Sequence, residues 1–211
     1  MAPTSSFELF YFELHGFGLP ARILLSLSGF DWTNRFPTNW AGEEKAKTPF
    51  GKIPLLTETR ADGSKFVLAE SSAICRYIAR KANFYSDNEE EAALIDQFAS
   101  NLTDIVVKGF RARSLKTSDP EQYKVEYEKY RDNEFKPAFD KHEQHLAKSA
   151  SGYYVGDRLT LADVFAVFAI ALINQNNVEI SEETYPHMNK LYQKIAALEP
   201  VKAELNRFPK K

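Results

Sequence analysis

Tyr11 lies where a short apolar run meets a loop, and its phenol is a candidate for chemistry. The run from Phe7 to Phe12 is rich in aromatic residues and is typical of a strand buried on both faces. A phenol is a weak nucleophile near neutral pH but a competent hydrogen-bond donor, so it can stabilise an anion that a ligand brings in. A structural tyrosine at a strand end gives the same pattern, and Tyr11 taken alone favours that alternative.

A thiolate is the natural anion for such a donor. A free thiol has a pKa of about 8.5 and is only a few per cent ionised at pH 7, whereas donors aimed at the sulfur favour its charged form. Lowering the thiol pKa by about two units requires roughly 2.7 kcal/mol of differential interaction. One short hydrogen bond and the N-terminal dipole of a helix beginning near Pro20 can supply it.

The stretch from Thr48 to Leu56 offers a backbone surface for a peptide-like ligand. Gly51 marks a turn, and Pro54 opens an apolar strand, which proline tolerates at a strand start or a sheet edge. An extended residue before proline can present its N–H and C=O as an added strand would use them, which makes Ile53 the candidate. A loop that enters an edge strand is the simpler alternative, and spacing alone favours it.

Two groups of polar residues suit the carboxylates of such a ligand. Glu70 and Ser71 begin a predicted helix, where free N–H groups and the hydroxyl can hold a carboxylate and Glu70 can accept from an ammonium; an ordinary helix cap explains this pair equally well. An opposing group could hold a second carboxylate or be merely solvated: Trp40, Lys45, Lys47 and Lys52. An anion stabiliser, a strand edge and two carboxylate sites together fit a short peptide with a thiol, which describes glutathione.

The elements that position these residues are predicted in the order βαβ and then ββα. The apolar spacing and turn residues predict strands at Phe7 to Phe12, Phe30 to Phe36, Ile53 to Thr59 and Lys65 to Ala69, with helices at Pro20 to Gly29 and Ser71 to Lys81. This order predicts a small thioredoxin-like α/β layer, βαβββα. The Cys-x-x-Cys motif of redox members is absent, and Tyr11 occupies that neighbourhood.

After Asn88 the sequence predicts helices only. A stripe from Ile95 to Phe110 indicates a long helix, and a capping box at Ser118 to Glu121 opens another, which Pro137 should kink or break. A second cap lies at Thr160 to Asp163, and two helices finish the chain. We therefore predict a thioredoxin-like domain at 1–84, a linker at 85–90 and an all-helical domain at 91–211.

Composition limits the classes of partner. The net charge of −2 and the pI near 6.1 give no electrostatic footprint for nucleic acid or an anionic membrane. Four histidines and one cysteine, Cys75, give neither a metal-ligand cluster nor a disulfide framework. The apolar run from Val164 to Ile173 is about half of the ~20 residues that cross a bilayer. A cytoplasmic protein without a metal, nucleic-acid or membrane partner is predicted.

In this order the motifs resemble those of the cytosolic glutathione transferases of the tyrosine type, with most similarity to the sigma, mu and pi classes. The resemblance spans nearly the whole chain and is carried by Tyr11-Phe12 with Gly16 and Arg22, by Trp40, by Pro49 to Pro54, by Glu70 to Ile74 with Arg76-Tyr77, and by Gly156 with Thr160 to Asp163. It implies the two-domain architecture of that family, α/β and then all-α. It also implies an enzyme without a prosthetic group that transfers its co-substrate, glutathione, to hydrophobic electrophiles.

The resemblance also implies roles for single residues. Tyr11 would donate to the glutathione sulfur, Ile53 would pair with the cysteinyl part, and Pro54 would be cis. The remaining glutathione contacts would be Glu70 and Ser71 at the γ-glutamyl end, with Trp40, Lys45 and Lys52 at the glycyl carboxylate. Asp104 would reach the γ-glutamyl amine bound to the neighbouring subunit of a homodimer. The walls of the electrophile site would be Phe12, Leu14, Phe110 and Ser114.

Two residues depart from the family pattern. Phe17 stands where sigma and pi members usually carry an arginine near the thiol, although mu members are apolar there, and Glu70 replaces the commoner glutamine. A binding protein for hydrophobic ligands is one alternative, and the retained Tyr11 argues against it. A specialised glutathione-dependent isomerase or peroxidase is another, because the electrophile pocket is the variable part of the family.

Overall fold

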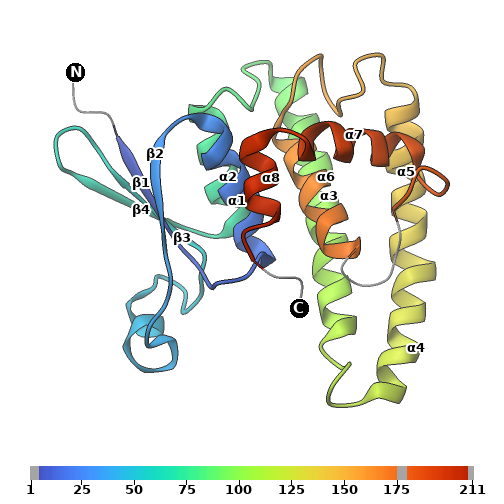
Figure 1. Ribbon diagram of the computed structural model, residues 1–211, viewed down its shortest axis with the longest axis horizontal. Helices are drawn as coiled ribbons and strands as arrows, with labels where there is room; N and C mark the ends of the chain where they lie inside the picture. The colour runs from blue at the N-terminus through green and yellow to red at the C-terminus, as the bar shows by residue number, and fades with distance from the viewer. Residues whose placement is uncertain (1–4, 175–179, 209–211) are drawn as a thin grey trace. The chain divides into compact units, whose positions relative to one another are not determined.

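The computed structural model describes residues 5–174 and 180–208, which form two compact units (Figure 1). The first unit holds the described residues up to Tyr85 and also those from Leu198 onward, and the second holds Ser86–Ala197. The sequence-based prediction assigned the whole segment 91–211 to one helical domain. The structure instead groups α8 (Glu199–Leu205) with the first unit, because this helix packs against α1 (Leu19–Ser28).

A four-stranded mixed sheet forms the frame of the first unit. Its strands are β1 (Ser6–Phe10), β2 (Asp31–Arg35), β3 (Leu55–Thr59) and β4 (Lys65–Ala69), in the spatial order β2-β1-β3-β4. β1 is parallel to β2 and antiparallel to β3, and β3 and β4 form an antiparallel hairpin. With the helices, this confirms the predicted α/β layer. One expectation is wrong: β3 is an interior strand, because β1 and β4 pair with its two sides.

The helices of the first unit begin and end where local signals predict. Pro20 lies in the first turn of α1, and Gly29 closes that helix with a φ of 72°, a conformation open to glycine. The helix α2 spans Ser71–Lys81. The segment after β2 contains a π-helical turn, Trp40–Glu44, and a 3-10 turn, Lys45–Lys47.

The second unit is all-helical, as predicted. Its elements are α3 (Glu89–Arg113), α4 (Pro120–Tyr130), a π-helical turn (Arg131–Phe135), α5 (Lys136–Ala147), α6 (Leu161–Asn174) and α7 (Pro186–Ala196). The helix α6 packs against α3 and is buried from Leu161 to Ile173. The break predicted near Pro137 is the π-helical turn that precedes α5. Within the described ranges, no helix combines the length and the apolar character that crossing a membrane requires.

Candidate functional site

The Tyr11 side chain lies just beyond the end of β1 and is only 6% exposed. Its hydroxyl oxygen accepts a hydrogen bond from the backbone N–H of Phe17, at 3.1 Å. Its own backbone N–H donates to the Arg35 carbonyl, at 3.1 Å, which extends the β1–β2 pairing by one residue. Among the described residues no acceptor is found for the hydroxyl hydrogen of Tyr11, so the phenol has one donor left for a ligand.

Two glycines fix the position of the Tyr11 ring. A Cβ atom added at Gly18 would lie 2.4 Å from Cδ1 of Tyr11, and one added at Gly16 would lie 2.7 Å from its hydroxyl oxygen. Both distances are far below van der Waals contact, so the backbone of the 3-10 turn Gly16–Gly18 packs directly on the ring. The family resemblance includes Gly16 but gives no role to Gly18.

The electrostatic surroundings keep Tyr11 protonated. Burial raises the pKa of its phenol above the ordinary value, while the Phe17 N–H and the positive charge of Arg22 oppose that shift. A raised phenol pKa leaves the hydroxyl hydrogen in place near neutral pH. Tyr11 is therefore equipped to donate a hydrogen bond rather than to accept a proton.

Arg22 holds the chain that follows Tyr11. Its side chain is fully buried and donates to the carbonyls of Phe12 and Leu14, at 3.0 and 2.7 Å, and to Oδ1 of Asn34, at 2.9 Å. Burial lowers the pKa of the Arg22 guanidinium to about 10, so it stays charged near neutral pH. The resemblance singled out Arg22, but no sequence signal linked it to Asn34 on β2.

The Ile53–Pro54 peptide bond is cis, which confirms that prediction. Pro54 is buried directly before β3, whereas Ile53 is half-buried. In the described part of the chain, neither the N–H nor the C=O of Ile53 has a hydrogen-bond partner. The free backbone expected at Ile53 is therefore present, although it extends an interior strand and not an edge.

Glu70 adopts an unusual backbone conformation at the start of α2. Its φ of 71° lies in the left-handed region, which is uncommon for residues other than glycine. Such conformations concentrate at functional sites, where the surrounding structure maintains them. Its carbonyl accepts the Ile74 N–H, at 2.9 Å, but its exposed side chain makes no capping hydrogen bond. Glu70 is thus free to meet a ligand, with Ser71 beside it.

The strand register brings the predicted site residues to one end of the sheet. Leu55 pairs with Phe10 on one side and with Ala69 on the other. The residues next to these three partners are therefore neighbours: Tyr11, Pro54 and Glu70. This end of the sheet thus presents a hydrogen-bond donor, a free backbone segment and a helix start.

The residues expected at the glycyl carboxylate lie beside this end of the sheet. The Trp40 ring contacts that of Phe12 edge-on, with ring centroids 5.5 Å apart. A Cβ atom added at Gly51 would lie 3.7 Å from Cε of Lys45, so the Lys45 side chain reaches the turn before Lys52. Lys47 instead forms an exposed ion pair with Glu43, at 2.8 Å, and matches the solvated alternative.

The other predicted residues divide between the two units. Phe12 and the 41% exposed Leu14 belong to the first. Phe110 lines an apolar pocket between α3, α4 and α6. Ser114 donates to the Arg111 carbonyl at 2.7 Å, and Asp104 is exposed on α3.

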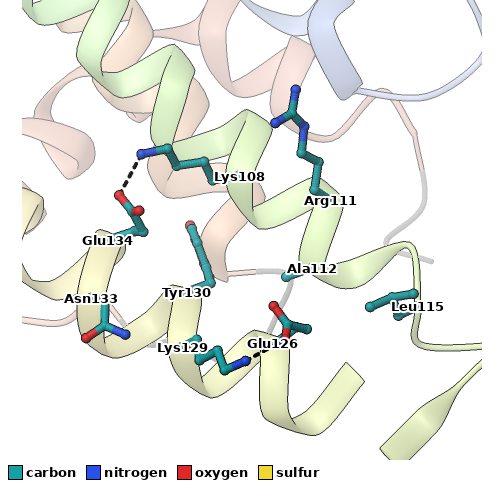
Figure 2. A pocket seen from close by; sticks show the side chains of 9 residues that line it. All are labelled: Lys108, Arg111, Ala112, Leu115, Glu126, Lys129, Tyr130, Asn133 and Glu134. Carbon is teal, nitrogen blue, oxygen red and sulfur yellow. Dashed lines mark hydrogen bonds and ion pairs between the residues drawn. The ribbon is translucent and has the colours of Figure 1, made fainter. Parts of the chain in front are cut away.

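A separate cavity of about 350 Å³ lies between α3 and α4, bordered by the ion pairs Lys108–Glu134 and Lys129–Glu126 (Figure 2). No predicted site residue lines that cavity.

The chain is similar to known proteins in both sequence and structure. The family models described as glutathione S-transferase N-terminal and C-terminal domains match residues 16–81 and 103–206. A putative glutathione S-transferase alpha-2 of Dictyostelium discoideum is 32% identical over 90% of this chain and 89% of its own. The structure of prostaglandin synthase D of Nilaparvata lugens is 26% identical, with a TM-score of 0.81 over 97% of this chain and 98% of its own. The glutathione S-transferase of Ascaris lumbricoides is 29% identical, with a TM-score of 0.77 over 98% of both chains.

Proposed function

Because the chain belongs to the glutathione S-transferase family, we propose that Tyr11 activates the thiol of bound glutathione for transfer to an electrophile. The observation that carries this proposal is the hydroxyl of Tyr11. Its oxygen accepts from the Phe17 N–H at 3.1 Å, which leaves its hydrogen for an acceptor supplied by a ligand. That hydrogen is donated to the glutathione sulfur and stabilises the thiolate.

The reaction then follows from the charge on sulfur. The thiol proton leaves to solvent, the thiolate forms a new S–C bond to the electrophile, and the leaving group departs with its bonding electron pair. The Tyr11 hydroxyl contributes by stabilising the negative charge before the attack. Phe17, which departs from the family pattern, contributes through its backbone N–H.

The other residues at this end of the sheet suit the peptide part of glutathione. The unpaired backbone of Ile53 fits the cysteinyl residue, and Glu70 with Ser71 fits the γ-glutamyl end. The glycyl carboxylate lies near Trp40, Lys45 and Lys52. Asp104 completes the γ-glutamyl site of the neighbouring subunit in a homodimer, and the protein acts in the cytoplasm.

The electrophile site draws its walls from Phe12, Leu14, Phe110 and Ser114. The exposed Leu14 and the apolar pocket at Phe110 support an apolar electrophile. Glutathione-dependent isomerisation is a second candidate, favoured by the likeness to a protein described as a prostaglandin synthase. In that reaction the same thiolate adds to the substrate and is later released.

The variant Tyr11→Phe tests the proposed role. We expect kcat for conjugation with a general aryl halide to fall about 10²-fold, because one donor to the developing anion is removed. Glutathione affinity, measured by calorimetry, should change little. Unchanged turnover would overturn the role of Tyr11. A wild-type protein that binds immobilised glutathione but acts on neither the aryl halide nor a hydroperoxide would favour the binding-protein alternative.

A further inference from the structure

The guanidinium of Arg22 lies close to both the Tyr11 ring and a second aromatic ring near the other end of the chain. The guanidinium carbon of Arg22 lies 5.7 Å from the centroid of Tyr11 and 4.8 Å from that of Phe208. Both distances are within the range of cation–π attraction. Phe208 follows α8 and is half-buried in the first unit. The buried guanidinium is thus covered by one ring from the proposed site and one from the C-terminal segment.

Phe208 also contacts His15, which precedes the 3-10 turn Gly16–Gly18 that packs on the Tyr11 ring. The His15 and Phe208 rings meet edge-on, with centroids 5.5 Å apart, and the His15 carbonyl accepts the Leu19 N–H at 3.0 Å. Burial and the positive charge of Arg22 lower the pKa of His15, while the nearby Leu205 backbone opposes the shift. The C-terminal segment therefore holds the start of Gly16–Gly18, which supplies the Phe17 N–H.

The position of Phe208 is fixed by a buried carboxylate on α8. Glu204 is 2% exposed and accepts from Ser26 on α1, at 2.8 Å, and from Arg207, at 2.6 and 2.7 Å. The Ser26 bond attaches α8 to α1, the helix that also carries Arg22, and the Arg207 bonds hold the residue next to Phe208. These contacts hold the segment that carries Phe208, whose ring lies 4.8 Å from the Arg22 guanidinium carbon.

We propose that Phe208 is a positioning residue for the Tyr11 hydroxyl. Its ring confines Arg22, which holds the carbonyls of Phe12 and Leu14, and confines His15, which begins the turn that binds Tyr11. Without the ring, the guanidinium can tilt toward water and release those carbonyls. A displacement of about 1 Å at a reacting group can lower a rate by as much as 10²-fold. This inference rests on the role proposed for Tyr11.

The test is the pH dependence of kcat/KM for the electrophile at saturating glutathione, whose midpoint reports the pKa of the enzyme-bound thiol. In Phe208→Ala we expect the midpoint to rise toward that of free glutathione and kcat at pH 6.5 to fall about tenfold, with KM for glutathione little changed. Phe208→Tyr keeps the aromatic face and should keep the wild-type midpoint. Phe66→Ala is the matched control, because it removes a ring 5.6 Å from the Arg60 guanidinium in the same unit.

Two further variants make every outcome decisive. Phe208→Leu keeps most of the volume without the aromatic face, so its midpoint decides the question if Phe208→Ala fails to fold. On a Tyr11→Phe background, Phe208→Ala should cause no further rise in the midpoint, because it acts through the hydroxyl. A folded Phe208→Ala or Phe208→Leu variant with wild-type midpoint and kcat would overturn the inference while Tyr11→Phe still shows its loss. A Tyr11→Phe variant with the wild-type midpoint would instead overturn the proposed function.

Discussion

At the scale of single residues, the proposed site depends on the lack of a side chain at Gly18. Gly18 has an ordinary backbone conformation, so nothing in its own geometry requires glycine; the requirement comes from the Tyr11 ring, which lies where a Cβ atom would go. Phe17 presents a related case, because it serves the site through its N–H, which any residue except proline would provide.

We predict that Gly18→Ala lowers kcat at least tenfold and destabilises the fold by about 1–3 kcal/mol, since the new methyl group forces the ring to move. Steady-state kinetics and urea unfolding measure both effects. Gly63→Ala is the control, because Gly63 has a φ of 81° and no atom within 4 Å of an added Cβ. It should lose stability through backbone strain and keep its kcat. A Gly18→Ala variant with wild-type kcat would contradict the role of this glycine.

At the scale of elements, the start of α6 depends on one buried carboxylate. Asp163 accepts from the N–H and Oγ1 of Thr160, at 2.8 and 2.9 Å, and from the Tyr154 N–H, at 2.9 Å. The first two bonds belong to the predicted cap, and the third attaches the preceding loop. Burial raises the pKa of Asp163 to about 6, while these hydrogen bonds oppose the shift.

This shift predicts how the stability of the fold varies with pH. The folded-state pKa lies above the unfolded value of 3.8, so the stabilising contribution of this titration is fully present below pH 3.8 and is lost as the pH rises through about 6. The unfolding free energy of the wild type relative to Asp163→Asn should fall by up to about 3 kcal/mol between pH 4 and pH 7. Urea unfolding of both proteins across this range measures the difference. A difference independent of pH would rule out the raised pKa.

Local signals predicted most elements, and contacts distant in sequence account for what they missed. The helix Ser71–Lys81 and the α1 stop at Gly29 agree with prediction, because caps and apolar spacing act within a few residues. Nothing local indicates that β3 is interior, since that depends on its pairing with both β1 and β4. The left-handed φ of Glu70 and the packing of Phe208 on Arg22 likewise arise from tertiary structure. The motifs therefore named the contacts proposed for glutathione, together with Gly16 and Arg22, but neither Gly18 nor Phe208.

At the scale of the whole molecule, the proposed function makes each active site depend on two copies of the chain. Asp104 is exposed on α3 and belongs to the all-helical unit, whereas Tyr11 belongs to the sheet-containing unit. Under this proposal the Asp104 carboxylate binds the γ-glutamyl amine held by the partner. Asp104→Ala should then raise KM for glutathione about tenfold, as expected for the loss of one charge-assisted hydrogen bond. Sedimentation should show an intact dimer, and a monomeric wild type would contradict the shared site.

A mixed dimer distinguishes a shared site from one completed within its own chain. In a dimer of one Tyr11→Phe subunit and one Asp104→Ala subunit, the second subunit keeps its own Tyr11 and receives Asp104 from the first. One intact site is therefore restored, and the purified, differently tagged heterodimer should show about half of the wild-type activity at limiting glutathione. If Asp104 acted within its own chain, both sites of the heterodimer would be defective and activity would stay at the level of the parent variants.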